Sequence, residues 1–233
     1  MTMSSRERHV FPLYLLGLAL ALYVGSAFSS ERDKLPQTTH DGLQLREGTE
    51  MYAVYERPGA DLGEYDKIAL IDAYVAFKKN YQREHNRNVI RPGDRITDEE
   101  MNKIRQRLAE EFKEVFTKVL VEEGGHQMAE QGTSGTLVIR PAIINLDVTA
   151  PDQQTAGRDY SFAASAGSMT LYMELYDGRT GEIIYRVIDP EAALDRGQFQ
   201  WANAVTNRME ADRILRKWAE LLNSRLKAVK GGK

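Results

Sequence analysis

The sequence predicts an α/β (α+β) fold: a mixed β-sheet with one parallel strand–helix–strand crossover, an antiparallel hairpin and two long amphipathic helices packed on it. Three segments lead to this prediction. Lys67–Phe77 is almost continuously apolar and rich in β-branched residues, Asp98–Glu122 carries one apolar stripe at helical spacing, and Gly167–Tyr176 alternates apolar and polar residues. The order strand, helix, strand, hairpin and helix therefore favours a single sheet covered by helices.

The first 27 residues have the pattern of a secretory signal. Arg6 and Arg8 precede an uncharged apolar run, Val10–Val24, and the small residues Gly25 and Ala27 follow it. A signal peptidase would cut before Phe28. The alternative is an uncleaved signal anchor, because the apolar stretch 10–28 is 19 residues long and a spanning helix needs about 17–25. Either version exports the rest of the chain to the periplasm or cell envelope.

The exported part divides into a lead-in, 28–64, and a single mixed α/β domain, 65–230. The lead-in is rich in turn-forming proline and glycine, as at Pro58-Gly59, and lacks a helical or strand period. We expect it to wrap the domain as an extended segment, with one edge strand at Met51–Tyr55.

The domain opens with the crossover. Lys67–Phe77 predicts a central strand buried on both faces, because its apolar run is nearly unbroken. A helix, Asp98–Glu122, follows; Thr97 and Glu100 form a capping box at its start, and Gly124-Gly125 ends it. The next strand, Thr136–Val148, should lie parallel to the first by a right-handed crossover.

The hairpin and the last helix complete the domain. Pro141 interrupts the strand Thr136–Val148 and predicts a bulge or an edge there. Gly167–Tyr176 turns at Asp177–Gly181 and returns as Glu182–Ile188. The face expected to be buried on the first hairpin strand carries Met169, Leu171, Met173 and Leu175. Apolar residues from Val205 to Leu226 recur at helical spacing.

Composition excludes several kinds of site. The chain has no cysteine, which removes disulfides, thiolate metal sites and a cysteine nucleophile. Its formal net charge of −3 argues against a nucleic-acid partner. The four histidines share no metal-ligand spacing, and no nucleophile elbow or phosphate-binding glycine loop is present, so we expect neither a metal nor a cofactor.

Two long connections form the candidate binding site. Residues 78–97 hold six basic side chains against two acidic ones, and residues 149–166 hold another arginine. If the two central strands are parallel, both connections leave the carboxyl end of the sheet, where open α/β sheets bind ligands. The hypothetical site binds an envelope protein or anionic envelope component; the alternative is that these charges only solvate the loops. Its residues are Lys78, Lys79, Arg83, Arg87, Arg91, Arg95 and Arg158.

A second, smaller cluster lies near the ends of the central strands. Asp72, Asn145 and Asp147 supply oxygen ligands of the kind that hard cations bind. The alternative is structural, with either aspartate paired with Arg140 or capping a turn.

Five segments resemble the bacterial family known as domain of unknown function 3313, whose members are regarded as envelope lipoproteins. The resemblance implies an envelope protein facing the periplasm, and it implies no catalytic residues. The chain departs from the lipoprotein pattern because it has no cysteine to be acylated. The segments are Leu35–Leu43 (LPQTTHDGL), Ala73–Glu84 (AYVAFKKNYQRE), Arg140–Asp152 (RPAIINLDVTAPD), Ser165–Ile184 (SAGSMTLYMELYDGRTGEII) and Trp218–Leu222 (WAELL).

Two functions from different classes remain open at this level. The first is a non-catalytic binding or assembly module in the periplasm, in which membrane contact is limited to an uncleaved N-terminal segment. The second is a hydrolase or other enzyme with a site at the carboxyl end of the sheet, using Asp72, Asp147 or His85. Its candidate acid–base residues lack motif spacing, so only their geometry can support it.

The signal pattern predicts that residues 1–27 are absent from the mature protein. Intact-mass measurement of protein from the cell envelope tests this. A mass that retains Met1 or Met3 would mean that the segment stays as a membrane anchor and that the cleavage site at Ala27 is not used.

Overall fold

The computed structural model describes residues 32, 34–87, 89–90, 92–148, 161–163, 167–192, 200–202 and 204–231. Thr38–Lys233 forms one compact unit, and all the strands and the long helices belong to it. Met1–Gln37 forms a separate unit, of which only residues 32 and 34–37 are described.

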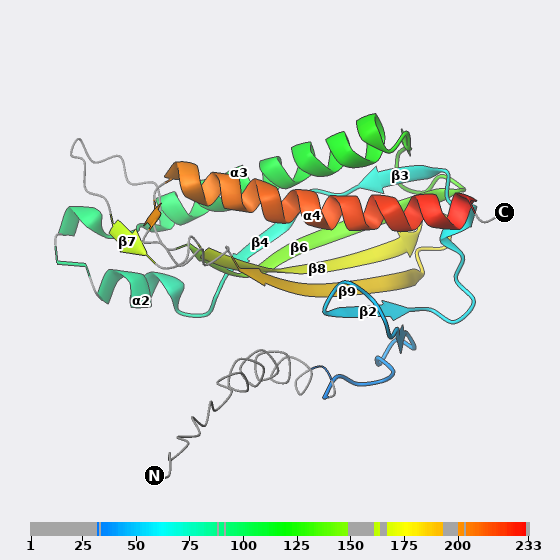
Figure 1. The fold of residues 1–233 in the computed structure, drawn as a ribbon, viewed down its shortest axis with the longest axis horizontal. Helices are drawn as coiled ribbons and strands as arrows, with labels where there is room; N and C mark the ends of the chain where they lie inside the picture. Colours follow the sequence, from blue (N-terminus) through cyan, green and yellow to red (C-terminus); the bar gives the residue numbers. More distant parts are fainter. Residues whose placement is uncertain are drawn as a thin grey trace, which may run out of the picture. The chain divides into compact units, whose positions relative to one another are not determined.

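A mixed sheet is the centre of this unit (Figure 1). In the described part of the chain its order is β1-β2-β9-β8-β6-β3-β5, and β4 also pairs with β6. β3 and β4 are both parallel to β6, which confirms the predicted crossover, whereas β6, β8 and β9 are antiparallel neighbours. The strands are β1 (Gln44–Leu45), β2 (Ala53–Glu56), β3 (Lys67–Leu70), β4 (Tyr74–Phe77), β5 (Gln127–Met128), β6 (Thr136–Val148), β8 (Gly167–Asp177) and β9 (Ile183–Ala192). A second, two-stranded sheet pairs β7 (Ser161–Ala163) with β10 (Gln200–Ala202).

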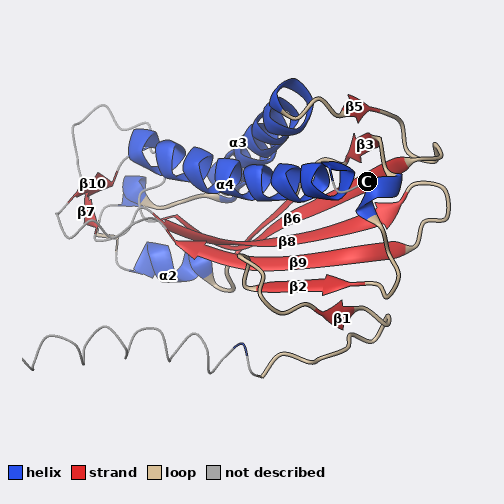
Figure 2. Cartoon of the chain, turned by 45° about the vertical axis from the view of Figure 1, so that its right-hand side comes forward, coloured by secondary structure: helices blue, strands red, loops and turns tan. Residues whose placement is uncertain are grey.

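The two long helices lie together on one face of the large sheet (Figures 1 and 2). α3 (Asp98–Thr117) begins at the predicted capping box and ends five residues earlier than predicted, where a π-helical stretch, Lys118–Glu123, continues it. α4 (Ala204–Gly231) is the last element. Short helical elements are α2 (Tyr81–Arg87), η1 (Leu62–Glu64) and η2 (Pro92–Asp94).

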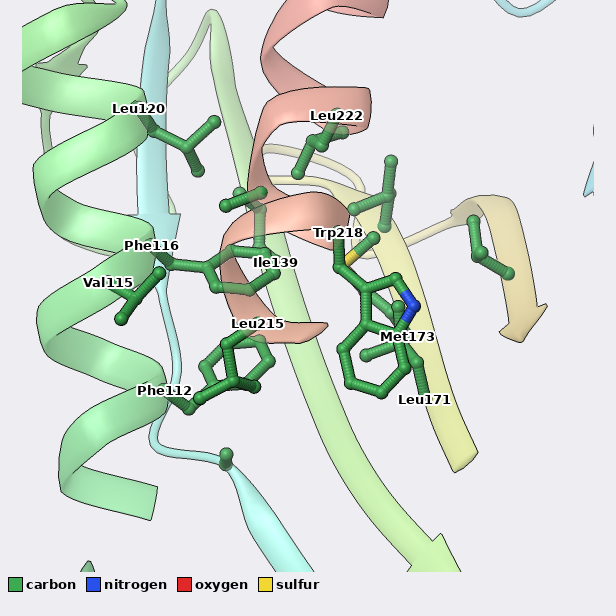
Figure 3. Packing of buried hydrophobic residues seen from close by; sticks show 14 of the residues in the cluster. Phe112, Val115, Phe116, Leu120, Ile139, Leu171, Met173, Leu215, Trp218 and Leu222 are labelled. Atoms are coloured by element: carbon green, nitrogen blue, oxygen red, sulfur yellow. The ribbon is translucent and has the colours of Figure 1, made fainter. Parts of the chain in front are cut away.

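The core fills the space between these helices and the sheet (Figure 3). The Phe112 and Phe116 rings of α3 stack with centroids 3.9 Å apart and lie toward Ile139 of β6, while Trp218 of α4 lies over Leu171 and Met173 of β8 (Figure 3). The predicted apolar face of β8 is buried as expected. The labelled aromatic residues of the two helices therefore pack over different strands, β6 and β8 (Figure 3).

Asp189 connects α4 to the sheet through two hydrogen bonds, one buried and one partly buried. Its carboxylate accepts the indole N–H of Trp218 at 2.8 Å and the backbone N–H of Tyr52 at 2.7 Å. Asp189 is only 4% exposed. A buried carboxylate needs such donors, because an unpaired one is costly in a low-dielectric interior. One side chain thus joins β9, α4 and the chain entering β2.

The prediction of one continuous strand over Lys67–Phe77 is wrong, and Pro141 explains why. The Ile71 N–H donates to the Ile139 carbonyl at 2.9 Å, so a continuing parallel ladder would need the next N–H, at 141, to donate to the Ile71 carbonyl. Proline has no N–H. The chain therefore leaves the sheet at residues 71–73 and returns as β4.

Pro141 itself causes no bulge and lies at no edge, contrary to expectation. It pairs with Met173 inside β6, which has neighbours on both sides. The bulge falls further along the strand, between Ile144 and Asp147, where Asn145 adopts φ 53°. Proline is accommodated because its missing donor faces the gap between β3 and β4.

The segment that precedes the crossover is part of the sheet. β2 forms, close to the predicted Met51–Tyr55, but it is flanked by the two-residue β1 and is not the outermost strand. Before β1, Asp41 forms a bidentate ion pair with Arg186 of β9, at 3.1 and 2.6 Å. Arg186 also binds Glu174 of β8 at 2.8 Å, and its side chain is only 10% exposed. This arginine fastens the start of the unit to two central strands.

We predict that Trp218→Ala lowers the free energy of unfolding by about 3–5 kcal/mol, and Phe112→Ala by a similar amount, because each removes a large buried ring. Trp218→Phe keeps most of the packing but leaves Asp189 short of a donor, which should cost about 1–3 kcal/mol. Chemical denaturation measures all three. Met209→Ala is the matched control, because Met209 lies on α4 and is 67% exposed. A loss below about 1 kcal/mol at Trp218 would contradict the packing.

The Arg186 cluster predicts a loss of stability in acid. Hydrogen bonds from Arg186 hold the pKa of Asp41 well below its ordinary 3.8; burial opposes this shift. Burial alone would raise the pKa of Glu174 above 4.5, but hydrogen bonds from Tyr176 and Arg186 lower it. Lowered carboxyl pKa values stabilise the fold above the ordinary values, and that contribution fades as pH falls below about 4.

Asp41→Asn should therefore cost about 1.5–3 kcal/mol at pH 7, the value of a charged hydrogen bond, and flatten the decline between pH 5 and pH 2. Denaturation curves across this range measure both effects. Asp72→Asn serves as the control, because the Asp72 side chain is 80% exposed. Equal pH profiles for wild type and Asp41→Asn would contradict a role for this carboxylate.

Candidate functional site

The candidate site begins where β4 ends. The Lys78 N–H donates to the Leu146 carbonyl at 3.0 Å, and Asn80, at φ 64°, turns the chain into α2. Asparagine tolerates this left-handed conformation better than most residues. α2 and the β7–β10 pair lie at the same end of the unit (Figures 1 and 2).

An aromatic column fixes α2 against the sheet. Phe77 stacks on Tyr81 with ring centroids 4.6 Å apart, and Tyr81 stacks on His85 at 5.8 Å. The Tyr81 hydroxyl donates to the Val148 carbonyl at 2.8 Å. Burial raises the pKa of Tyr81 and lowers the pKa of His85, so both side chains are neutral at pH 7. The connection after β4 and the end of β6 are therefore held together, as the parallel arrangement predicted.

Side-chain amides close the loop that returns to α3. The Asn86 amide donates to the Ile96 carbonyl at 2.9 Å and accepts the Ile96 N–H at 2.8 Å. Gln82 donates to the Asp98 carboxylate at 2.9 Å. Because these bonds fix both ends of the loop, the first turns of α3 are set beside α2.

A groove of about 660 Å³ lies between β4, α2 and the start of α3. Its walls combine aromatic and basic side chains, and Tyr74 on its rim is 68% exposed. The lining residues are Tyr74, Val75, Ala76, Phe77, Lys78, Asn80, Tyr81, Gln82, Arg83, Met101 and Arg105.

The charges of the groove are only partly neutralised. Lys78 pairs with Asp147 at 2.6 Å and with Glu84 at 3.8 Å, and the Asp147 hydrogen bond raises the pKa of Lys78. Arg83 and Arg105 make no ion pair with any carboxylate in the described ranges. The Arg105 guanidinium lies 5.4 Å from the centre of the Phe77 ring and bonds Asn102. Within the described residues, the charges of these two guanidinium groups are therefore not balanced by an ion pair.

Only some of the seven basic residues predicted as a binding site line the groove. Lys78 and Arg83 line the groove, whereas Lys79, Arg87 and Arg95 are exposed on the same segment outside it. Arg91 and Arg158 lie outside the described residues, so the predicted contribution of the 149–166 connection stays a prediction.

Sequence reasoning missed Arg105 and Tyr74. Arg105 belongs to the polar side of α3 and gave no signal beyond its charge, while Tyr74 lay inside a run assigned as buried. An arginine two turns into a helix that packs against an edge strand would have been the signal, but the edge strand itself was not foreseen.

The smaller polar cluster does not assemble as a cation site. Asp147 pairs with Lys78, and Asp72 pairs with Lys113 of α3 at 2.9 Å, so the predicted pairing with Arg140 is wrong. Asn145 is exposed at the bulge. Within the described residues, no three histidine or acidic side chains gather as metal ligands. Nor does any helix in that part of the chain have the length and apolar character needed to cross a membrane.

The solved structures to which the chain is similar are distant. PelC from Paraburkholderia phytofirmans, solved as a dodecamer, is 12% identical with a TM-score of 0.35, covering 73% of this chain and 95% of its own. A candidate lipoprotein from Caulobacter crescentus CB15 is 14% identical with a TM-score of 0.34, covering 55% and 86%. The hypothetical protein CT253 from Chlamydia trachomatis is 11% identical with a TM-score of 0.35, covering 69% and 98%. At these values the likeness assigns no role.

Sequence comparison with families is more decisive. No curated protein matches the chain. The sequence profile described as "Protein of unknown function (DUF3313)" matches residues 28–222, which is most of the chain and all of the crossover, groove and hairpin. The chain belongs to the DUF3313 family.

Proposed function

We propose that this protein is a non-catalytic binding or assembly module of the bacterial envelope, exported by its N-terminal signal, that holds an anionic partner in the groove between β4, α2 and α3. One observation carries the proposal: Arg83 and Arg105 line one groove without a carboxylate partner in the described part of the chain. Guanidinium groups are planar donors that match carboxylates and phosphates.

The make-up of the groove supports binding by a protein more than by a small ion. Tyr74 is largely exposed and lines the same groove as the arginines, and tyrosine and arginine are enriched where protein interfaces concentrate their binding energy. The Phe77 ring and the Met101 side chain add apolar surface to the same walls. A partner with carboxylates beside apolar side chains fits this mixture.

The alternative, an enzyme with Asp72, Asp147 or His85 at its centre, has less support. Both aspartates are engaged by lysines, at 2.9 and 2.6 Å. His85 is stacked on Tyr81. A general base needs a free position beside a substrate proton, and these contacts occupy the carboxylates.

We expect Arg83→Gln together with Arg105→Gln to weaken partner binding at least about tenfold, because each charged hydrogen bond is worth roughly 1.5–3 kcal/mol. Arg87→Gln together with Arg95→Gln makes the matched control, with the same charge change at exposed arginines outside the groove. The readout is photo-crosslinking in living cells from position 74, and from position 209 as an equally exposed control on α4.

The proposal is supported if an acidic partner is captured from position 74 and not from position 209. This capture should be lost in the groove pair, Arg83→Gln with Arg105→Gln, and kept in the control pair. Equal loss in both arginine pairs would mean that overall charge alone attracts the partner. Unchanged capture in the groove pair would refute the site, provided that its unfolding free energy stays within about 0.5 kcal/mol per change, as for surface positions.

A further inference from the structure

Among the described residues, no strand lies along the edge of β4 that is turned away from β6. In the described part of the chain β4 pairs with β6 alone, although β6 has neighbours on both sides. The groove runs along this strand, since all four β4 residues line it. The backbone of β4 is therefore part of the site, in addition to the arginines.

The register shows which backbone groups face outward. Lys78 N–H donates to Leu146 of β6, and backbone groups of successive residues in a strand point to opposite sides. Residues 74 and 76 then face β6 as Lys78 does. The N–H and C=O groups of Val75 and Phe77 face the other way, with no strand beside them among the described residues.

We propose that β4 accepts an extended, acidic peptide segment of a partner protein as an additional strand. This inference rests on the proposed function and gives it a binding mode. An added strand gains affinity from main-chain hydrogen bonds and specificity from alternate side chains. Here the main-chain partners are Val75 and Phe77, and charge complementarity with Arg83 and Arg105 selects acidic side chains.

The strand geometry also places those acidic residues. The Val75 side chain is buried on the helix-covered face of the sheet, so Phe77 points to the same face. Arg105 lies over the Phe77 ring on that face. Only those residues of the added strand that share this face can reach Arg105, so we expect acidic residues there, and apolar residues at the alternate positions, which lie on the face of Tyr74.

The test uses a labelled six-residue peptide of alternating glutamate and valine, with the purified full chain. Val75→Pro removes the outward N–H without removing a bond to β6, and proline is tolerated at such edge positions. Val75→Ala is the control, because it loses more apolar volume but keeps the N–H. We expect Val75→Pro to weaken peptide binding at least tenfold, and Val75→Ala to weaken it less than threefold.

A second readout does not depend on the variants. Peptide binding to the unaltered protein should slow amide hydrogen exchange in the fragment covering residues 74–78, and a peptide with lysine in place of glutamate should not. Anionic phospholipid vesicles serve as the competing probe. Binding to vesicles without binding to the peptide overturns the inference.

The outcomes separate the two proposals. Suppose that peptide binding needs Arg83 and Arg105 but is equal in Val75→Pro and Val75→Ala, and that amide hydrogen exchange in residues 74–78 is unchanged. This result overturns strand addition and leaves the groove as a site for an anionic partner. No binding of the glutamate peptide to the unaltered protein also overturns strand addition. If cellular capture is lost only in the control pair, Arg87→Gln with Arg95→Gln, the partner binds outside the groove. That result contradicts the proposed function but does not test strand addition to β4.

Discussion

The backbone nitrogen of Pro141 carries no hydrogen, and the arrangement of the chain beside β6 depends on this one missing donor. β3 pairs with the first part of β6 and cannot continue past it, so the chain leaves the sheet for three residues and returns as β4. The detour changes which residues of the returning strand face β6. The returning strand, β4, pairs with β6, and α2 and the groove follow directly from it.

The arginines of the unit have two different environments. Arg186 is nearly buried and has two carboxylates, Asp41 and Glu174, which offset the cost of removing a guanidinium from water. Arg83 and Arg105 line the groove without a carboxylate partner among the described residues, and Arg105 lies over the Phe77 ring, which also favours a cation. In a chain with net charge −3, this local excess of positive charge is a feature of the groove and not of the whole surface.

Periodicity predicted those elements whose pattern is local. The alternation along Gly167–Asp177 and the apolar stripe of α3 follow from one strand or helix burying one face, so the sequence contains the whole signal. The break after Leu70 was not predictable in the same way, because its cause lies on the neighbouring strand, seventy residues away. A proline in β6 shows its effect in β3 and β4.

Part of the candidate site was predictable from the order of the elements along the chain. The crossover implied that the connections after β4 and β6 start at one end, and Tyr81 bonds the Val148 carbonyl there. Which basic residues face the groove depends on α2, a seven-residue helix with too few turns to show a period. Ion pairs such as Lys78–Asp147 join residues 69 positions apart, and sequence offers many equally plausible partners for each.

The ion pair between Asp41 and Arg186 also bears on the order in which the molecule can form. These residues are 145 positions apart, and Tyr52 and Asp189 are 137 apart. At synthesis rates of roughly 5–20 residues per second, the first partner of each pair waits on the order of ten seconds for the second. During that interval β1, β2 and the apolar Leu43 beside them have no surface on which to dock. The segment that comes first in the sequence therefore cannot join the sheet until β9, made much later, is available to pair with it.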